Sequence, residues 1–328
     1  MSFVPEIFEL DTLQEVAPHA RAVAVGNFDG VHRGHQLLLR SLEQGIAKGA
    51  ASRCVLTFHP HPSSVLAPAH APIPLYTLEE RVRQLRDAGA DEVIVLRFNE
   101  QLSRLTAEEF ARDVLARCLQ TRQVVVGENF RYARDKEGCI DTLAKHGALY
   151  GFDVEALPLL VDRGIPVSSS QIRKLLLEGK VSRAARLLGR PYAIEGPIVQ
   201  GRGVGSKQTV PTLNLAPPST LVPSDGVYVT RAVVLASGRA YQAVSNIGYR
   251  PTFQDGHPER SIETFVLDEL QERPEAIRLE FLARLREERR FDSPEALRAQ
   301  ILRDVRSAQN LHRRVARWRP SAFGRGKG

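Results

Sequence analysis

The chain has 328 residues, of which 43% are hydrophobic and 25% charged, a composition that is ordinary for a soluble globular protein of two domains. The net charge of +7 permits nucleic-acid binding but suits small anions such as nucleotides equally well. No apolar run approaches the roughly 20 residues of a membrane helix, the N-terminus does not resemble a secretion signal, and three well-separated cysteines favour a reduced, cytoplasmic setting.

The first half of the chain alternates short apolar runs with amphipathic segments. Thr77 with Glu80, and Thr106 with Glu109, fit capping boxes at two helix starts, and the charged run 79–83 is interpreted as a solvated helix face. The alternation predicts an α/β domain with a parallel sheet and helices on both faces, whose ligands bind at the carboxyl ends of the strands. Strands are expected over 21–25, 53–58, 91–98, 122–126 and 153–160, and helices over 35–48, 77–88 and 106–119.

The pattern changes near residue 190, after a helix-rich stretch at 169–188. Valine-rich runs broken by Gly and Pro predict a small antiparallel β-barrel, closed by a helix over 294–309 with Ser293 as its N-cap. The expected domains are 1–188 and 189–312, followed by a basic tail at 313–328 that is interpreted as a frayed end. The barrel strands are expected over 193–200, 226–235, 240–247, 261–267 and 276–284.

Residues 26–36 read GNFDGVHRGHQ and follow the first apolar run directly. His32 and His35 are three residues apart at the start of a helix-like segment, so their imidazoles would share a face. A helix N-terminus with two imidazoles suits a phosphate, and Gly34 would let a ligand approach the backbone closely. A pair of structural histidines and a zinc half-site are the alternatives.

This segment resembles the nucleotidyltransferase motif of the bacterial bifunctional riboflavin kinase/FAD synthetases, which implies a Rossmann-like first domain. The resemblance implies that His32 and His35 contact the nucleotide phosphates and stabilise charge at the α-phosphorus when a second phosphate attacks it. No covalent enzyme intermediate is implied. It also implies that the nucleotide is bound by Gly26, Asn27, Phe28 and Gly34.

A loop with two prolines, Phe58-His59-Pro60-His61-Pro62, follows the second predicted strand. The family resemblance implies that Phe58, His59 and Pro60 lie beside the flavin. An alternative is a zinc cluster made of the four histidines, but structural zinc sites usually include cysteine, and Cys54 lies on a predicted strand. The histidines of that alternative are His32, His35, His59 and His61.

Two further segments resemble motifs of the same family. Residues 127–138 read GENFRYARDKEG, in which the resemblance implies that Asn129 binds nucleotide, while Phe130 and Tyr132 are either ligand contacts or core aromatics. Alanine at 133 and lysine at 136 depart from the family pattern, and lysine cannot make a bidentate phosphate contact. Residues 167–173 read VSSSQIR. The resemblance implies that Ser168, Ser169 and Arg173 bind the triphosphate. The alternative is an N-cap cluster of serines with a surface arginine.

Residues 196–215 read GPIVQGRGVGSKQTVPTLNL and resemble the riboflavin kinase phosphate loop. The resemblance implies that Gly201 and Gly205 bind nucleotide. Strand alternation places Thr212 and Asn214 on one face, where neutral oxygens suit Mg²⁺ held by ATP. The departures from the family pattern are Ser206, Gln208 and Thr209.

Residues 261–268 read SIETFVLD and resemble the kinase element that carries the catalytic base. Glu263 takes that position and would accept the proton of the riboflavin 5′-hydroxyl as it attacks the γ-phosphate of ATP. The histidine usual in the family is Phe265 here. The alternative interpretation of Glu263 is a solvated residue at the edge of a strand. Separately, Arg284 or Arg286 is a candidate phosphate contact.

Together these motifs imply two ATP-dependent steps, riboflavin to FMN in the C-terminal domain and FMN to FAD, with release of pyrophosphate, in the N-terminal domain. The implied small molecules are ATP, riboflavin, FMN, FAD and Mg²⁺. No nucleic-acid or membrane partner is expected, and the chain is expected to be a monomer or weak oligomer. One alternative is an FMN adenylyltransferase with a weak or inactive kinase domain. Another is a nucleic-acid-binding protein, although no interleaved aromatic and basic motif supports it.

Overall fold

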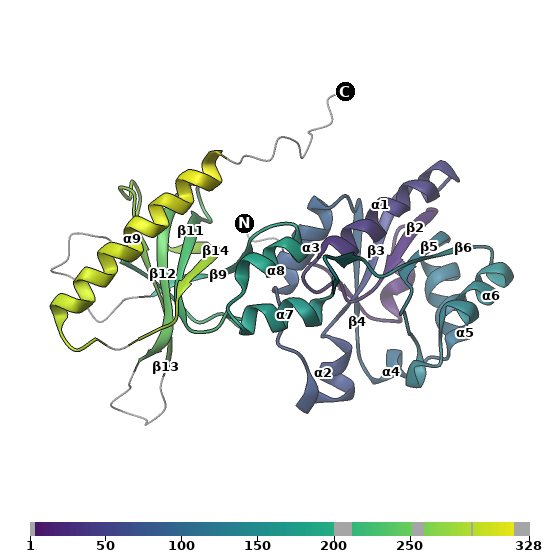
Figure 1. The fold of residues 1–328 in the computed structure, drawn as a ribbon. Coiled ribbons are helices and arrows are strands. Elements are labelled where there is room, and N and C mark those ends of the chain that lie inside the picture. Colours follow the sequence, from purple (N-terminus) through teal and green to yellow (C-terminus); the bar gives the residue numbers. More distant parts are fainter. Residues whose placement is uncertain (1–3, 200–211, 251–258, 290, 318–328) are drawn as a thin grey trace. The chain divides into compact units, whose positions relative to one another are not determined.

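The computed structural model describes residues 4–199, 212–250, 259–289 and 291–317 (Figure 1). The chain divides into two compact units, 1–171 and 172–328. Helix α8 (Val181–Leu188) packs on two barrel strands, which explains why it groups with the second unit. This division does not test where one domain ends and the next begins in folding, so the boundary expected between residues 188 and 189 stays a prediction.

The first unit contains a six-stranded parallel sheet in the order β1-β4-β3-β2-β5-β6. The five longer strands are confirmed. The sequence missed β1, which has two residues and no readable period, and extended β6 past its last residue, Leu157. The strands are β1 (Ile7–Phe8), β2 (Arg21–Val25), β3 (Ser52–His59), β4 (Glu92–Arg97), β5 (Thr121–Gly127) and β6 (Asp153–Leu157).

Helices cover both faces of this sheet, as predicted (Figure 1). Helices α1 and α3 cover one face, and η1, η3 and α6 cover the other. Both capping boxes are present, at the starts of α3 and α5. The elements are η1 (Thr12–Glu15), α1 (Arg33–Ala47), α2 (Pro62–Leu66), η2 (Pro68–His70), α3 (Leu78–Asp87), α4 (Glu100–Ser103), α5 (Ala107–Glu109), η3 (Phe110–Cys118), η4 (Arg134–Lys136), α6 (Ile140–Tyr150) and the hairpin β7 (Val161–Asp162) with β8 (Ile165–Pro166).

The second unit is a closed antiparallel barrel in the order β10-β13-β12-β11-β14-β9, as predicted. Helix α9 packs over β11, β12 and β14 and runs to Arg317 instead of ending at 309, because Leu311 and His312 lie against the barrel. The elements are α7 (Ser169–Leu177), which begins in the first unit, α8, β9 (Tyr192–Val199), β10 (Thr212–Leu215), β11 (Gly226–Val234), β12 (Ala240–Arg250), β13 (Glu259–Val266), β14 (Ala276–Arg286) and α9 (Pro294–Arg317).

An ion pair between a buried arginine and a half-buried glutamate joins the amino ends of the central strands. Arg21 is fully buried, and its Nε and Nη2 donate to Oε2 of Glu92 over 3.1 and 3.0 Å. The other carboxylate oxygen of Glu92 is hydrogen-bonded to His19 and Ser52. Burial alone would raise the pKa of Glu92, but the hydrogen bonds from Ser52 and His19 and the charge of Arg21 outweigh it and hold the pKa below its ordinary value.

Replacing Glu92 by Gln should destabilise the first unit by roughly 3 kcal/mol, because the buried Arg21 cation loses its counter-charge. Since the folded pKa of Glu92 is depressed, this contribution is present above its unfolded pKa and is lost as the pH falls through the folded one. Urea unfolding of both proteins at several pH values measures the difference. In the control, Glu9→Gln removes the exposed partner of Arg97 and should cost about 1 kcal/mol or less. Equal effects of the two changes would contradict the assignment.

Candidate functional site

The sequence motifs of the first unit meet where the strand order of the sheet reverses. Strand β2 pairs with β3 on one side and with β5 on the other. The segment 26–32 follows β2, and 127–129 lies at the end of β5. In open α/β sheets, such a reversal leaves a crevice at the carboxyl ends of the strands, where ligands bind.

The two histidines lie side by side at the start of α1. His32 is the N-cap residue, and its Nδ1 accepts a hydrogen bond from the main-chain N–H of His35 over 3.3 Å. The two rings are stacked, with centroids 3.6 Å apart and planes 18° apart. Because Nδ1 of His32 accepts, the proton of its neutral ring is on Nε2, so the ring can act as a donor.

The sequence predicted that Gly34 lets a ligand approach the backbone. In the structure, Gly34 also leaves space for a neighbouring side chain, the ring of His32. A Cβ at this position would lie 3.2 Å from both Nδ1 and Cε1 of the His32 ring, and 3.7 Å from the carbonyl oxygen of Val167. The absence of a side chain therefore makes room for the capping imidazole itself.

The loop between β2 and α1 has an unusual backbone. Phe28 and Val31 have φ angles of 49° and 39°, although neither is glycine and Val31 is β-branched. The side chains of Phe28 and Val31 are both buried. The main-chain N–H of Leu75 donates to the Asp29 carboxylate, with both oxygens 3.1 Å from the nitrogen, and this contact anchors the loop. Such strain persists where surrounding contacts over-determine a conformation, which is common at functional sites.

Asn27 connects this loop to the next one. Its side-chain amide lies 3.3 Å from Nε2 of His61, and Nδ1 of His61 accepts the N–H of Ser63 as the cap of α2. Because Nδ1 of His61 is an acceptor, a neutral ring carries its proton on Nε2 and donates there. Nδ2 of Asn27 is the atom that faces Nε2 of His61, and turning the amide by 180° would place its oxygen there as the acceptor.

The last two residues of β3 and the residue after it are those expected beside the flavin. Phe58, His59 and Pro60 are all half-buried, the His59–Pro60 peptide is cis, and the Phe58 ring packs edge-on against Phe98 with centroids 6.2 Å apart. Burial, followed by the charge of Arg81, lowers the pKa of His59 below its ordinary value. His59 is therefore neutral near pH 7. Its contact with flavin stays a prediction.

The segment after β5 divides its residues between the core and the surface. Tyr132 is buried in the core, and its ring stacks on Phe130 with centroids 5.4 Å apart and lies 5.4 Å from Phe110. The core interpretation is thus confirmed for Tyr132. Asn129 is exposed beside the end of β5, as a nucleotide contact requires.

The serine segment connects to the histidine loop. The Ser169 hydroxyl donates to the main-chain oxygen of Asp29 over 2.7 Å, and the Ser168 hydroxyl accepts from the N–H of Gln171 over 3.2 Å. Ser168 therefore caps α7, in agreement with the N-cap interpretation, while Ser169 bridges the two motifs. Arg173 lies on α7 in the second unit, and its contact with phosphate stays a prediction.

The charged run 79–83 is not the solvated face that the sequence suggested. Glu80 and Arg81 are only 3% and 6% exposed, whereas Arg83 is exposed. Glu80 completes a capping box. Arg81 lies four residues before the fully buried Leu85, and this spacing is the signal that could have placed it on the inner face of α3.

The barrel brings three polar side chains into one row. Asn214 on β10 is paired with Glu263 on β13, and Glu263 is paired with Asn246 on β12. All three are half-buried and lie on the face opposite the buried interior. Thr212 shares the face of Asn214, as predicted. The sequence did not single out Asn246 as a site residue, because only the strand register places it beside Glu263.

These residues fit the chemistry expected for a kinase site. Hydroxyl and amide oxygens of Thr212 and Asn214 are hard ligands that suit Mg²⁺, and a carboxylate lies on the neighbouring strand. In the described residues no three His, Cys, Asp or Glu side chains gather into a group that could hold a metal by themselves. The other predicted kinase residues lie outside the described residues; they are Gly201, Gly205, Ser206, Gln208 and Thr209.

The two candidate arginines of β14 both contact other parts of the second unit. Arg286 donates from Nε to Asp304 of α9 over 3.0 Å, and Arg284 donates to the main-chain oxygen of Asp225. Phe265 is paired with Thr212 across the β10–β13 ladder, so it flanks the predicted metal ligands.

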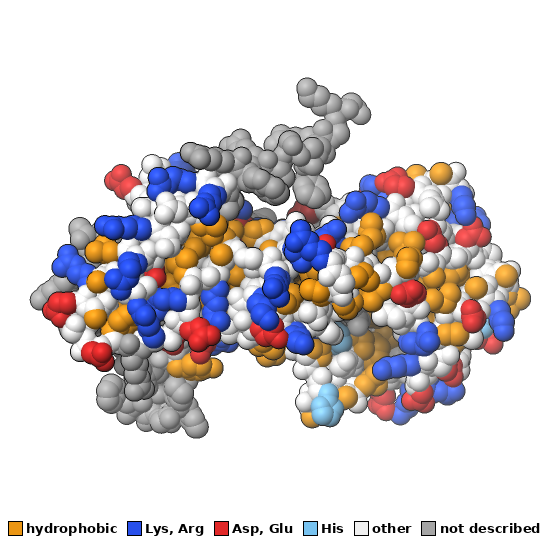
Figure 2. All heavy atoms as spheres, viewed as in Figure 1, with side chains coloured by type: hydrophobic (Ala, Val, Ile, Leu, Met, Phe, Trp, Pro, Cys, Tyr) orange, Lys and Arg blue, Asp and Glu red, His pale blue; other side chains and the backbone are white. Residues whose placement is uncertain are grey.

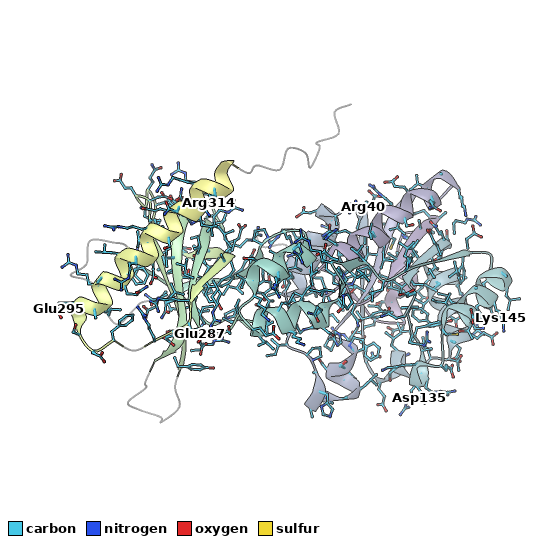
Figure 3. The ribbon with its side chains drawn as sticks, in the orientation of Figure 1. Arg40, Asp135, Lys145, Glu287, Glu295 and Arg314 are labelled. Atoms are coloured by element: carbon cyan, nitrogen blue, oxygen red, sulfur yellow. The ribbon has the colours of Figure 1, made fainter. Side chains whose placement is uncertain are left out.

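Charged side chains are distributed over the visible surface instead of forming one basic stripe (Figure 2). Helix α9 has exposed arginines along its length, and Glu295 and Arg314 lie near its two ends (Figure 3). Within the described ranges, no helix has both the length and the apolar composition needed to cross a membrane.

Comparison with known families matches both units. A family model described as FAD synthetase matches residues 14–171, and one described as riboflavin kinase matches residues 188–312. A bifunctional riboflavin kinase/FMN adenylyltransferase of Escherichia coli (strain K12) is 33% identical, covering 92% of this chain and 96% of that protein. The protein of the same description from Pseudomonas fluorescens is 36% identical over 89% of this chain and 94% of its own length.

A solved crystal structure has a similar fold. It is described as a macrolide-efflux protein from Streptococcus pneumoniae, is 29% identical, and covers 93% of this chain and 99% of its own, with a TM-score of 0.83. The relatives, the two family models and the motif positions agree with one another. The chain belongs to the family of bifunctional riboflavin kinase/FMN adenylyltransferases.

Proposed function

We propose that the chain makes FAD in two steps, phosphorylating riboflavin to FMN in the second unit and adenylylating FMN in the first. Family membership supports both activities. The observation that carries the first site is the stacked pair of His32 and His35 at the amino end of α1, where the strand order reverses. Its substrates are ATP, riboflavin and FMN. We further propose that the chain acts as a monomer or weak oligomer without nucleic acid.

In the adenylylation step, a phosphate oxygen of FMN attacks the α-phosphorus of ATP and pyrophosphate leaves. The helix N-terminus and the Nε2–H of His32 would stabilise the negative charge that builds up on the α-phosphate. The stack with His32 holds the His35 ring on the same side. Positioning and charge stabilisation are sufficient for such a transfer, and no covalent enzyme intermediate is required.

In the kinase step, Glu263 would accept the proton of the riboflavin 5′-hydroxyl, whose oxygen attacks the γ-phosphorus of ATP while ADP leaves. Thr212 and Asn214 would hold Mg²⁺, which neutralises charge on the ATP phosphates when bound. The pairing of Asn214 with Glu263 supports this division, because it places the metal ligand and the base on adjacent strands.

Incubation with riboflavin, ATP and Mg²⁺ tests the whole proposal. We expect FMN to form first and FAD afterwards. Activity on FMN but none on riboflavin would favour the enzyme with a silent kinase unit, which is the alternative suggested by the residues at 206, 208 and 209. Failure to convert either flavin would contradict both.

Gly34→Ala should lower kcat/KM for FMN adenylylation roughly tenfold or more, because the new Cβ would displace the His32 ring. The melting temperature should change little, because the preference of about 1 kcal/mol for alanine over glycine in a helix offsets the weakened cap of His32. Steady-state kinetics and thermal unfolding measure the two effects. Unchanged adenylylation would show that the ring position is not important.

His35→Ala should reduce kcat for FAD formation about 10²-fold or more, because one phosphate contact is lost. FMN formation from riboflavin should stay within twofold, since that reaction belongs to the other unit. His70→Ala, at an exposed histidine of η2, is the matched control and should change neither reaction. Equal loss of both reactions in His35→Ala would contradict separate sites.

Glu263→Gln should reduce riboflavin phosphorylation about 10²-fold or more while FMN adenylylation persists, because the amide cannot accept the proton. Glu280→Gln on β14, whose side chain pairs with Arg231, is the control for losing a barrel carboxylate. Product analysis by chromatography separates the two reactions. If the Glu263→Gln variant still phosphorylated riboflavin at the original rate, the assignment of Glu263 as the catalytic base would be wrong.

A further inference from the structure

A buried arginine contacts two segments that carry the candidate adenylylation site, the loop after β2 and the end of β3. Arg81 of α3 is 6% exposed. Its Nη1 donates to the main-chain oxygen of Asn27 and its Nη2 to that of Phe58, each over 2.9 Å. A single guanidinium therefore joins the loop after β2 to the carboxyl-terminal end of β3.

The two carbonyl groups belong to segments that the site depends on. Asn27 precedes the strained turn that leads to His32, and Phe58 precedes His59 in the segment expected beside the flavin. Because a trans peptide group points its C=O and N–H in opposite directions, holding the oxygen of Asn27 against Arg81 directs the N–H of Phe28 away from it. The guanidinium thus orients the backbone at the start of the loop 26–32.

Burying the Arg81 cation costs free energy. Burial lowers the pKa of its guanidinium, which the nearby charge of Asp29 opposes. In the described part of the chain its Nε–H has no hydrogen-bond partner. A buried, incompletely satisfied cation destabilises a fold relative to an apolar residue of similar size, so its presence beside these two segments favours a functional purpose.

We propose that Arg81 is a positioning residue for FMN adenylylation, whose planar fork holds the loop 26–32 and the end of β3 at the spacing that aligns the two substrates. The fork shape is essential, because two donors at a fixed separation hold two carbonyls and a single ammonium group does not. The inference rests on the adenylylation site proposed above.

The test compares Arg81→Met, Arg81→Lys and the control Arg83→Met in the full-length chain. Arg83 is exposed on the same helix, two residues away. We expect Arg81→Met to lose roughly tenfold or more in kcat for FMN adenylylation, with a smaller change in the KM for ATP. Arg81→Lys should fold normally and lose about fivefold or more, because it keeps the charge and loses the fork. Riboflavin phosphorylation by the same molecules should stay within twofold.

A second readout separates positioning from general destabilisation. The charge of Arg81 contributes to the low pKa of His59, so an NMR titration should give a higher His59 pKa in Arg81→Met and little change in Arg81→Lys. An Arg81→Lys enzyme with kcat within twofold of the unmodified chain would overturn the inference, even if Arg81→Met fails to fold. His35→Ala is measured beside it. If His35→Ala stays active, the site assignment itself fails, whereas a defective His35→Ala beside a fully active Arg81→Lys overturns only the inference about Arg81.

Discussion

The close packing of α1 on β2 determines the geometry of the first unit. A Cβ at Gly45 would lie 2.4 Å from that of Ala22, so the helix approaches the strand as near as side chains permit. The chain has only seven residues, 26–32, in which to turn from the strand into this helix. Phe28 and Val31 have positive φ angles within this short turn, which brings the helix N-terminus to the carboxyl ends of β2 and β5.

The two phosphate sites that we propose differ in the groups that would hold the phosphate. In the first, the positive end of a helix and two stacked imidazoles provide donors on a rigid turn, and the tautomer of His32 is set by the cap that it makes. In the second, the strand register of the barrel aligns Asn214, Glu263 and Asn246 across three neighbouring strands. A helix N-terminus needs no metal to attract an anion, whereas a row of oxygen donors beside a carboxylate suits a substrate that arrives with its own cation.

The sequence predicts the features that depend on local residue spacing. It does not predict those that depend on the pairing register of distant strands or on how deeply a side chain is buried. The strands and capping boxes follow from apolar runs and Thr–Glu spacing, and the histidine pair follows from the spacing of three. Asn246 was not predicted as a site residue because its neighbour Glu263 is 17 residues away and only the ladder pairs them. Arg81 was misinterpreted because the charges around it are typical of solvated helices, although its spacing from Leu85 places it inward.

Two buried guanidinium groups lie at opposite ends of the same sheet, and their partners differ. Arg21, at the amino ends of the strands, donates to main-chain oxygens and also to the carboxylate of Glu92, so it has the balanced charge of a structural ion pair. Arg81, at the carboxyl ends, donates to the main-chain oxygens of Asn27 and Phe58. The charge of Arg21 is thus balanced by a direct ion pair, whereas Arg81 lies at the proposed ligand site and its Nε–H has no partner among the described residues. This asymmetry is expected of a fold in which local rules are broken mainly at functional sites.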